Sequence, residues 1–200
     1  MKVAIADYGA GNLRSLSSAL ARAGVEPVVT IHGEVVRDAP LALIAGVGHV
    51  ESAAAGLARN GLDDVLRSRV DGGRPVAGIC VGMQLLFEAS EEGGEGLGVL
   101  AGPVRRLRAH RVPHMGWNAL AATRPSALLD GLDGADVYFA HSFAAEPSDE
   151  TVAIATVDHD GRVVAAVESG PVAGVQFHPE RSGPAGARVL ENLLRWSRSA

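Results

Sequence analysis

The sequence predicts an α/β protein with an open, mostly parallel sheet, helices on both faces of the sheet and an antiparallel hairpin in the C-terminal half. In the first half of the 200-residue chain, short apolar runs alternate with segments whose apolar residues recur at helical spacing, as in parallel sheets joined by helical crossovers. In the second half, the strand-like runs 151–157 and 162–168 flank Asp160 and Gly161, a dipeptide typical of hairpin turns. The length suits one core and nothing resembles a linker, so we expect a single domain over residues 1–200.

The elements of the first half follow from their local patterns. The helical spacing of leucines predicts a helix that begins near Leu13 and ends at Gly24. A later helical stretch would be divided at Gly61, and residues 83–87 predict a helix directly after a strand. Four apolar runs predict strands: residues 3–6, 28–31, 41–45 and 75–79.

The second half ends with one more strand and one more helix. Residues 172–177 follow a turn at Gly170 and Pro171 and predict a strand. Residues 185–198 carry a single apolar stripe, which predicts a helix packed on the sheet.

Composition excludes several classes of function. Hydrophobic residues make up 47% of the chain and charged residues 20%, as in ordinary globular proteins. No apolar run approaches the roughly 20 residues of a membrane span, and the N-terminus predicts a strand rather than a signal peptide. A net charge of −5 without a basic cluster argues against nucleic-acid binding. The single cysteine excludes an internal disulfide, so we expect a cytoplasmic protein.

That cysteine occupies a distinctive turn. Residues 78–82 (GICVG) lie where a predicted strand meets a predicted helix, and the spacing matches a nucleophile elbow, in which glycines leave room for a strained backbone. Such a turn would place Cys80 near a helix N-terminus, where the helix dipole favours a thiolate. Taken alone, Cys80 is equally well explained as a buried structural cysteine.

A second motif favours catalysis. Residues 174–180 (GVQFHPE) form a strand that ends in His178, Pro179 and Glu180, and the residue before a proline is biased toward extended conformations. Residues two apart in an extended segment face the same side, so Glu180 could orient the His178 imidazole while the other ring nitrogen faces a thiol. Alone, the pair could also be a surface turn; together with the cysteine turn it predicts a Cys–His–Glu triad.

These motifs resemble those of class I glutamine amidotransferases, which share a flavodoxin-like open sheet. The two signatures are residues 78–84 (GICVGMQ) and 176–180 (QFHPE). Within that family, three more segments are similar to the glutamine amidotransferase subunits of imidazole glycerol phosphate synthases, from histidine biosynthesis: residues 7–13 (DYGAGNL), 113–118 (PHMGWN) and 138–143 (YFAHSF). The resemblance runs from the first strand to the last helix.

The resemblance implies a reaction and a partner. Such subunits hydrolyse L-glutamine to glutamate, and the ammonia passes to a (β/α)₈ cyclase partner in a heterodimer, which makes imidazole glycerol phosphate and aminoimidazole carboxamide ribotide. By similarity, Cys80 forms a thioester, His178 moves the proton and Glu180 orients His178. Backbone N–H groups of Val47 and Val81 would hold the oxyanion. The remaining residues expected to border or bind the substrate are Gly46, Gly48, Gln84, His141, Ser142 and Phe143.

Other residues are candidates for the partner interface. The resemblance places Gly11 and Asn12 there, although an ordinary strand–helix turn capped by Asn12 explains them equally well. Trp117 and Tyr138 could be interface or core aromatics. Arg181, where lysine is usual, would meet the partner, and the chain also departs from the family at Ala45, usually proline, and at Phe143, usually tyrosine.

Metal and cofactor sites are not expected. His110 and His114 have the spacing of a zinc pair on a helix, but Pro113 would break that helix. The Gly9-x-Gly11 pattern lacks the third glycine of a dinucleotide loop.

Three alternatives remain. The first is a stand-alone γ-glutamyl cysteine hydrolase, which would not explain residues 114–118. The second is an amidotransferase subunit of another pathway. The third is a non-catalytic relative, which should have lost part of the triad.

Overall fold

The main feature of the fold is a mixed sheet. The computed structural model describes residues 1–9 and 13–199, and in them an eight-stranded sheet has the order β2-β1-β3-β4-β13-β12-β11-β8. Neighbours from β2 to β13 are parallel, and those from β13 to β8 are antiparallel. The strands are β1 (Lys2–Ala6), β2 (Glu26–Thr30), β3 (Leu41–Gly46), β4 (Val76–Cys80), β8 (Ala121–Ala122), β11 (Ala153–Asp158), β12 (Arg162–Ser169) and β13 (Val172–Val175).

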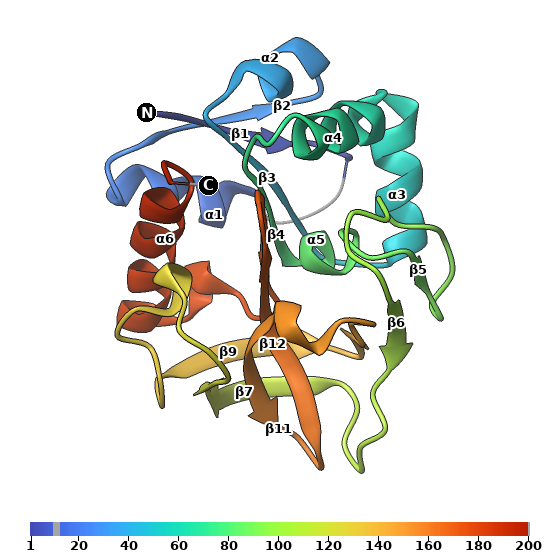
Figure 1. Ribbon diagram of the computed structural model, residues 1–200, viewed down its shortest axis with the longest axis vertical. Helices are drawn as coiled ribbons and strands as arrows, with labels where there is room; N and C mark the ends of the chain where they lie inside the picture. The colour runs from blue at the N-terminus through green and yellow to red at the C-terminus, as the bar shows by residue number, and fades with distance from the viewer. Residues whose placement is uncertain (10–12, 200) are drawn as a thin grey trace.

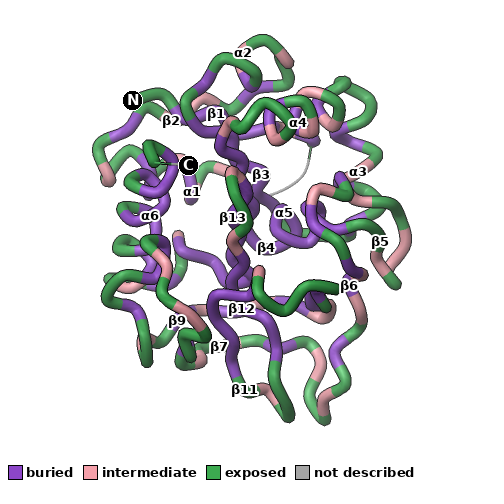
Figure 2. Tube along the Cα trace, viewed as in Figure 1, coloured by how far each residue is buried: buried purple, intermediate pink, exposed green. Residues whose placement is uncertain are grey.

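Helices cover both faces of the parallel strands, as predicted. Figure 1 shows α1 (Leu13–Arg22) and α6 (Gly183–Trp196) on one side, and α3 (Val50–Arg59), α4 (Leu62–Asp71) and α5 (Val81–Gln84) on the other. The short α2 (Gly33–Asp38) packs against α4 and β1. Strands β3, β4 and β13 are buried along their whole length (Figure 2). Burial on both faces explains why these strands are continuous apolar runs. None of the helices in the described part of the chain is long and apolar enough to cross a membrane.

Two smaller sheets, which the sequence analysis did not predict, flank the antiparallel part. One has the order β10-β6-β5 and the other pairs β7 with β9. Short 3-10 turns lie in the later connections: η1 (Ala127–Leu129) before β9, η2 (Glu150–Val152) before β11 and η3 (Pro179–Arg181) between β13 and α6. The strands are β5 (Ala89–Ser90), β6 (Pro103–Arg106), β7 (His114–Ala119), β9 (Asp136–His141) and β10 (Phe143–Ala145).

Two predicted boundaries are confirmed. Gly61 separates α3 from α4 and has a left-handed backbone, with φ of 62°. The β11/β12 pair is antiparallel, and its turn places Asp160 at φ 54° and Gly161 at φ 137°, values that Gly and Asp tolerate better than most residues. The other predicted elements are present, with ends shifted by a few residues.

The helix predicted over residues 83–87 is wrong in its extent, because α5 spans only Val81–Gln84. The carbonyl groups of Leu85, Leu86 and Phe87 do not continue a helical ladder. They accept hydrogen bonds from a later loop instead, from the N–H groups of Leu97, Leu100 and Gly98. A long-range partner therefore takes the acceptors that a longer helix would need.

Arg69 joins α4 to the end of α2 and to the start of β4 from inside the core. It is only 1% exposed, and burial lowers its pKa to about 10, so that it stays protonated at neutral pH. Its guanidinium donates hydrogen bonds of 2.8 to 2.9 Å to four backbone carbonyl oxygens, those of Val36, Arg37, Ala39 and Pro75. One side chain thus satisfies the carbonyls at the end of α2 and just before β4.

We predict that Arg69→Met lowers the free energy of unfolding by about 3–5 kcal/mol, because it leaves several buried carbonyl groups without donors. Urea denaturation at pH 7 measures the change. The exposed Arg59 is a matched control, and Arg59→Met should change stability by less than about 0.5 kcal/mol. Equal effects of the two substitutions would contradict this role of Arg69.

Candidate active site

The turn between β4 and α5 holds Cys80 in a strained backbone. Cys80 has φ of 55° and ψ of −112°, which few residues other than glycine adopt. The flanking glycines make the turn possible. A Cβ atom at Gly78 would lie 2.3 Å from the carbonyl oxygen of Gly82, and one at Gly82 would lie 1.8 Å from that of Ile44. The G-x-C-x-G spacing therefore has a steric cause in the packing of the turn against β3.

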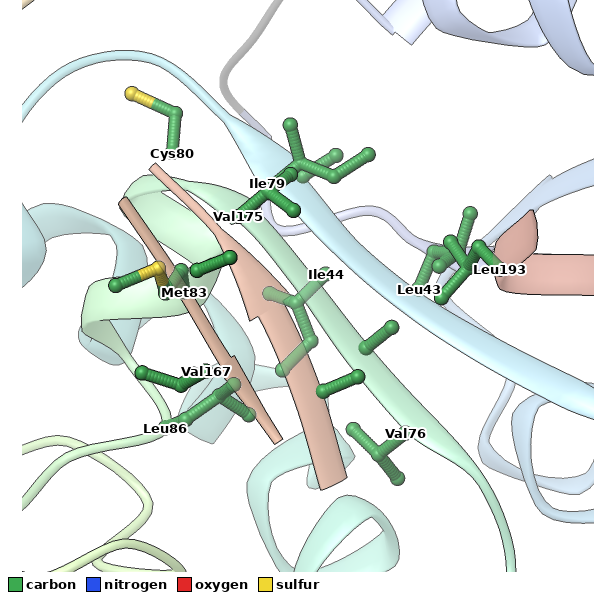
Figure 3. Close-up of a cluster of buried hydrophobic side chains, with 14 of the residues drawn as sticks. Leu43, Ile44, Val76, Ile79, Cys80, Met83, Leu86, Val167, Val175 and Leu193 are labelled. Atoms are coloured by element: carbon green, nitrogen blue, oxygen red, sulfur yellow. The ribbon is translucent and has the colours of Figure 1, made fainter. Parts of the chain in front are cut away.

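The thiol lies at the edge of the core. Cys80 is 3% exposed, and Figure 3 shows its sulfur pointing away from the buried cluster that contains Ile79, Met83 and Val175. The side-chain amide of Gln176 donates to Sγ at 3.7 Å. The strained turn thus directs the sulfur out of the apolar cluster.

His178 and Glu180 form a close pair beside Cys80. Nδ1 of His178 lies 2.9 Å from Oε1 of Glu180, and Glu180 belongs to the 3-10 turn η3 rather than to an extended segment. Burial by itself lowers the pKa of His178, but interactions with Cys80 and Glu180 outweigh it and raise the pKa to about 10. With Nδ1 engaged by the carboxylate, Nε2 is the nitrogen left for the thiol, and the imidazolium is a counterion for a thiolate.

A cavity of about 260 Å³ opens in front of Cys80. Most of the candidate substrate and oxyanion residues line it: Val47, Gly48, Val81, Gln84, His141, Ser142 and Phe143. Glu92, Pro113, Met115 and Ala140 also line it, and sequence reasoning missed them. Glu92 is held in place, because its carboxylate accepts from the Val50 N–H at 2.9 Å and lies 2.9 Å from His49 Nδ1. No local pattern distinguishes Glu92 from the acidic residues around it.

Gly46 lies next to the cavity rather than in its wall, and Tyr8 explains why it is a glycine. A Cβ atom at Gly46 would lie 1.4 Å from the Tyr8 hydroxyl oxygen, so any side chain here would displace Tyr8. The Tyr8 ring is buried, and burial and the nearby charges of Cys80 and Asp7 raise the pKa of its hydroxyl. Tyr8 therefore packs directly beneath the loop that carries Val47.

The side chain of His141, in addition to its backbone, makes hydrogen bonds in the cavity wall. Its Nδ1 lies 2.8 Å from the Phe143 carbonyl oxygen, and its Nε2 lies 3.0 Å from Nδ1 of His114. Both rings are buried, and burial lowers the pKa of His141 to about 3 and that of His114 to about 4. Both imidazoles are therefore neutral near pH 7.

The candidate interface residues that the structure describes gather on one surface. Arg181 lies 4.1 Å over the Tyr138 ring, and the rings of Tyr138 and Trp117 meet edge to face at 6.0 Å. Trp117 is 58% exposed and Met115 65%, so Trp117 is not a core residue. Gly11 and Asn12 lie outside the described residues.

The positions of the potential metal-ligating side chains are the structural observation that bears on metal binding. Among residues 1–9 and 13–199, no group of three or more His, Cys, Asp or Glu side chains is placed to hold a metal ion. His114 belongs to β7, and His110 pairs with Asp160 instead.

Known proteins are similar to this chain over nearly its whole length. Residues 4–196 match the family model described as glutamine amidotransferase class-I. The chain is 45% identical to the imidazole glycerol phosphate synthase subunit HisH of Geobacillus kaustophilus, over 96% of this chain and 95% of that protein. It is 46% identical to the protein of the same name from Mycolicibacterium paratuberculosis, over 96% of both chains.

Solved structures support the fold. A structure described as a glutamine amidotransferase superposes with a TM-score of 0.80 at 23% identity, over 98% of both chains. PurLQS from Thermotoga maritima gives a TM-score of 0.78 at 21% identity, again over 98% of both chains. At these identities the likeness concerns the fold alone.

We predict that acid weakens the fold through His114 and His141. Their pKa values are lowered on folding, so the unfolded chain binds more protons between about pH 4 and 6.5. The free energy of unfolding therefore has its full value above pH 6.5 and decreases as the pH falls toward the folded-state pKa values. Between pH 7 and pH 5, each ring should lower the free energy of unfolding by about 2 kcal/mol.

Urea denaturation of the wild type and of His141→Asn, at both pH values, isolates this contribution from the opposite effect of His178, whose pKa is raised. The loss of stability between pH 7 and pH 5 should be smaller in the variant by about 2 kcal/mol. An unchanged loss would show that His141 is not a buried neutral ring.

Proposed function

The chain belongs to the class I glutamine amidotransferases and, within them, to the family of imidazole glycerol phosphate synthase subunit HisH, and from this we propose that it is the glutaminase subunit of such a synthase. One observation carries the proposal for the site. Cys80, on a strained turn, faces a cavity beside the His178–Glu180 pair. Such an arrangement suits nucleophilic attack on an amide carbon.

The reaction that this site supports has two steps. Sγ of Cys80 attacks the side-chain amide carbon of glutamine, the C–N bond breaks, and His178 delivers a proton to the departing ammonia. Water, deprotonated by His178, then hydrolyses the γ-glutamyl thioester to glutamate and frees Cys80. Glu180 keeps Nδ1 of His178 occupied, so that Nε2 performs both transfers.

Two backbone N–H groups are suited to the oxyanion. Val81 is the first residue of α5, and the first N–H groups of a helix have no intrahelical acceptor. Val47 directly follows β3 and also lines the cavity. Fixed donors of this kind are worth about 3 kcal/mol each at the transition state.

The polar wall of the cavity suits the amino-acid end of glutamine. The Glu92 carboxylate lies in the wall and provides negative charge for the α-ammonium group. Gln84 uses its amide nitrogen on the Phe143 carbonyl and on Gln176, which leaves its oxygen to accept from the substrate. Backbone groups of Ser142 and Phe143 would bind the α-carboxylate.

The partner in this proposal is a (β/α)₈ cyclase that receives the ammonia and works in the cytoplasm with this subunit. The exposed side chains of Trp117, Met115 and Arg181, together with the half-buried Tyr138, form an apolar surface that contains one cation, as protein interfaces often do. An amidotransferase of another pathway would have a different partner, so co-purification of a cyclase barrel with this chain separates the two.

We predict that Cys80→Ala abolishes glutamine-dependent synthesis by the complex and leaves ammonia-dependent synthesis within about twofold of wild type. Only the thioester route needs the thiol, and loss of such a nucleophile costs about 10⁴-fold or more. Assays with glutamine and with ammonium salt measure the two activities in the same complex. Glutamate release by Cys80→Ala at the wild-type rate would refute the assignment of Cys80.

We predict that Glu180→Gln slows glutamine hydrolysis less than His178→Ala does. The first removes charge and orientation from His178, whereas the second removes the group that moves protons, worth about 10²–10⁴-fold. Comparison of kcat in the two complexes tests the order. Equal or greater loss in Glu180→Gln would mean that His178 is not the proton-transfer group.

A further inference from the structure

Side-chain hydrogen bonds connect strand β7 to the Cys80 pocket. The first part begins at the end of β11, where Asn118 Nδ2 donates to the Asp158 carbonyl oxygen at 2.8 Å. The same Nδ2 lies 3.4 Å from Nε2 of His114. Nδ1 of His114 then lies 3.0 Å from Nε2 of His141.

The second part runs along the wall of the pocket. His141 Nδ1 meets the Phe143 carbonyl oxygen at 2.8 Å, and Gln84 Nε2 donates to that same oxygen at 2.8 Å. Gln84 Nε2 also donates to Gln176 Oε1 at 3.0 Å. Because Gln176 in turn donates to Cys80, the chain of contacts reaches the nucleophile.

The carbonyl groups of Phe143 and Asp158 determine which atom donates and which accepts in each hydrogen bond of the network. A carbonyl oxygen only accepts, so His141 carries its proton on Nδ1, and its bare Nε2 accepts from Nδ1–H of His114. The other carbonyl, that of Asp158, requires the Asn118 amide nitrogen at its present place, so Nε2 of His114 is an acceptor. Both histidines are therefore neutral Nδ1–H tautomers, in agreement with the lowering of their pKa values by burial.

Packing fixes the plane of the His114 ring. The ring stacks on Phe139 at a centroid distance of 4.5 Å on one face and on His159 at 4.1 Å on the other. Its exposed fraction is 4%. A ring that is clamped in this way can hold His141 in a single orientation.

Resting on the proposed glutaminase function, we propose that His114 is a positioning residue for glutamine binding, which acts through His141 on the Phe143 carbonyl and the Gln84 amide. His114 does not itself line the cavity, whereas His141, Phe143 and Gln84 do. Hydrogen bonds from His141 and Gln84 fix the Phe143 carbonyl group. They thereby keep this part of the pocket wall in the conformation that binds the amino-acid end of the substrate. The buried His114 of β7 thus serves binding through His141, whereas Met115 and Trp117 alternate with it along the strand and are exposed, and Met115 also borders the cavity.

Steady-state glutamine hydrolysis by the complex with its cyclase tests this role. His114→Leu removes the donor to His141 and should raise KM for glutamine about tenfold, with kcat within about threefold of wild type. In His114→Asn the amide nitrogen replaces Nδ1 as donor, so KM should return to within about threefold of wild type. His110→Leu, at an exposed histidine outside the network, is the matched control and should leave both constants unchanged.

Three results would overturn the proposal: a KM of His114→Leu within twofold of wild type, equal effects of Leu and Asn, or a loss confined to kcat. Nitrogen-15 NMR of the two histidines supplies a readout that needs no activity and no variant. An Nε2–H tautomer at either ring would refute the network even where His114→Leu fails to fold. A wild-type complex that binds its cyclase without hydrolysing glutamine would instead refute the proposed function, and the tautomers would still test the network.

Discussion

The site depends on one steric constraint, the close approach of the Cys80 turn to β3. Gly78, Gly82 and the Ile44 carbonyl lie so close that no side chain fits between them. The chain can therefore leave β4 only by a tight turn, which gives Cys80 a strained backbone with positive φ and places its sulfur outside the apolar cluster. The buried parallel strands on both sides of β4 keep the turn from relaxing, so stability of the core maintains strain at the site.

The two halves of the sheet contribute different things to that site. The parallel half supplies Cys80 and the loop after β3, the proposed nucleophile and oxyanion loop, both at the carboxyl ends of neighbouring strands, where open α/β sheets commonly bind ligands. The antiparallel half supports β7 and β9, which provide His114 and His141. Because side chains alternate along a strand, β7 has polar groups, among them His114, toward the interior, and apolar groups, Met115 and Trp117, on its exposed face. One strand therefore connects the proposed partner surface to the proposed glutamine pocket.

Sequence reasoning succeeded where the determinant is local. The cysteine turn, the Gly61 break and the Asp160–Gly161 hairpin each lie within a few residues. The contact of His178 with Glu180 was also predicted, although Glu180 lies in a 3-10 turn and not in the extended segment from which the contact was inferred. Sequence reasoning failed where the partner is distant. Strand β7 contains Gly116 and Asn118, poor strand formers, and pairs with β9 far along the chain; His114 and His141 are 27 residues apart. The short α5 likewise reflects acceptors taken by a later loop, and contact of Tyr8 with Gly46 required the fold.

The most direct test of the account is covalent labelling of the pocket. A glutamine-like diazoketone has the amino-acid end that the pocket should bind and a carbon atom that only an activated nucleophile attacks. Cys80 is the sole cysteine of the chain. Mass spectrometry of the digested complex should find one adduct, on Cys80, whose formation excess glutamine prevents. Labelling at another residue, or labelling of Cys80 that glutamine does not slow, would contradict the claim that this turn is the nucleophile of a glutamine site.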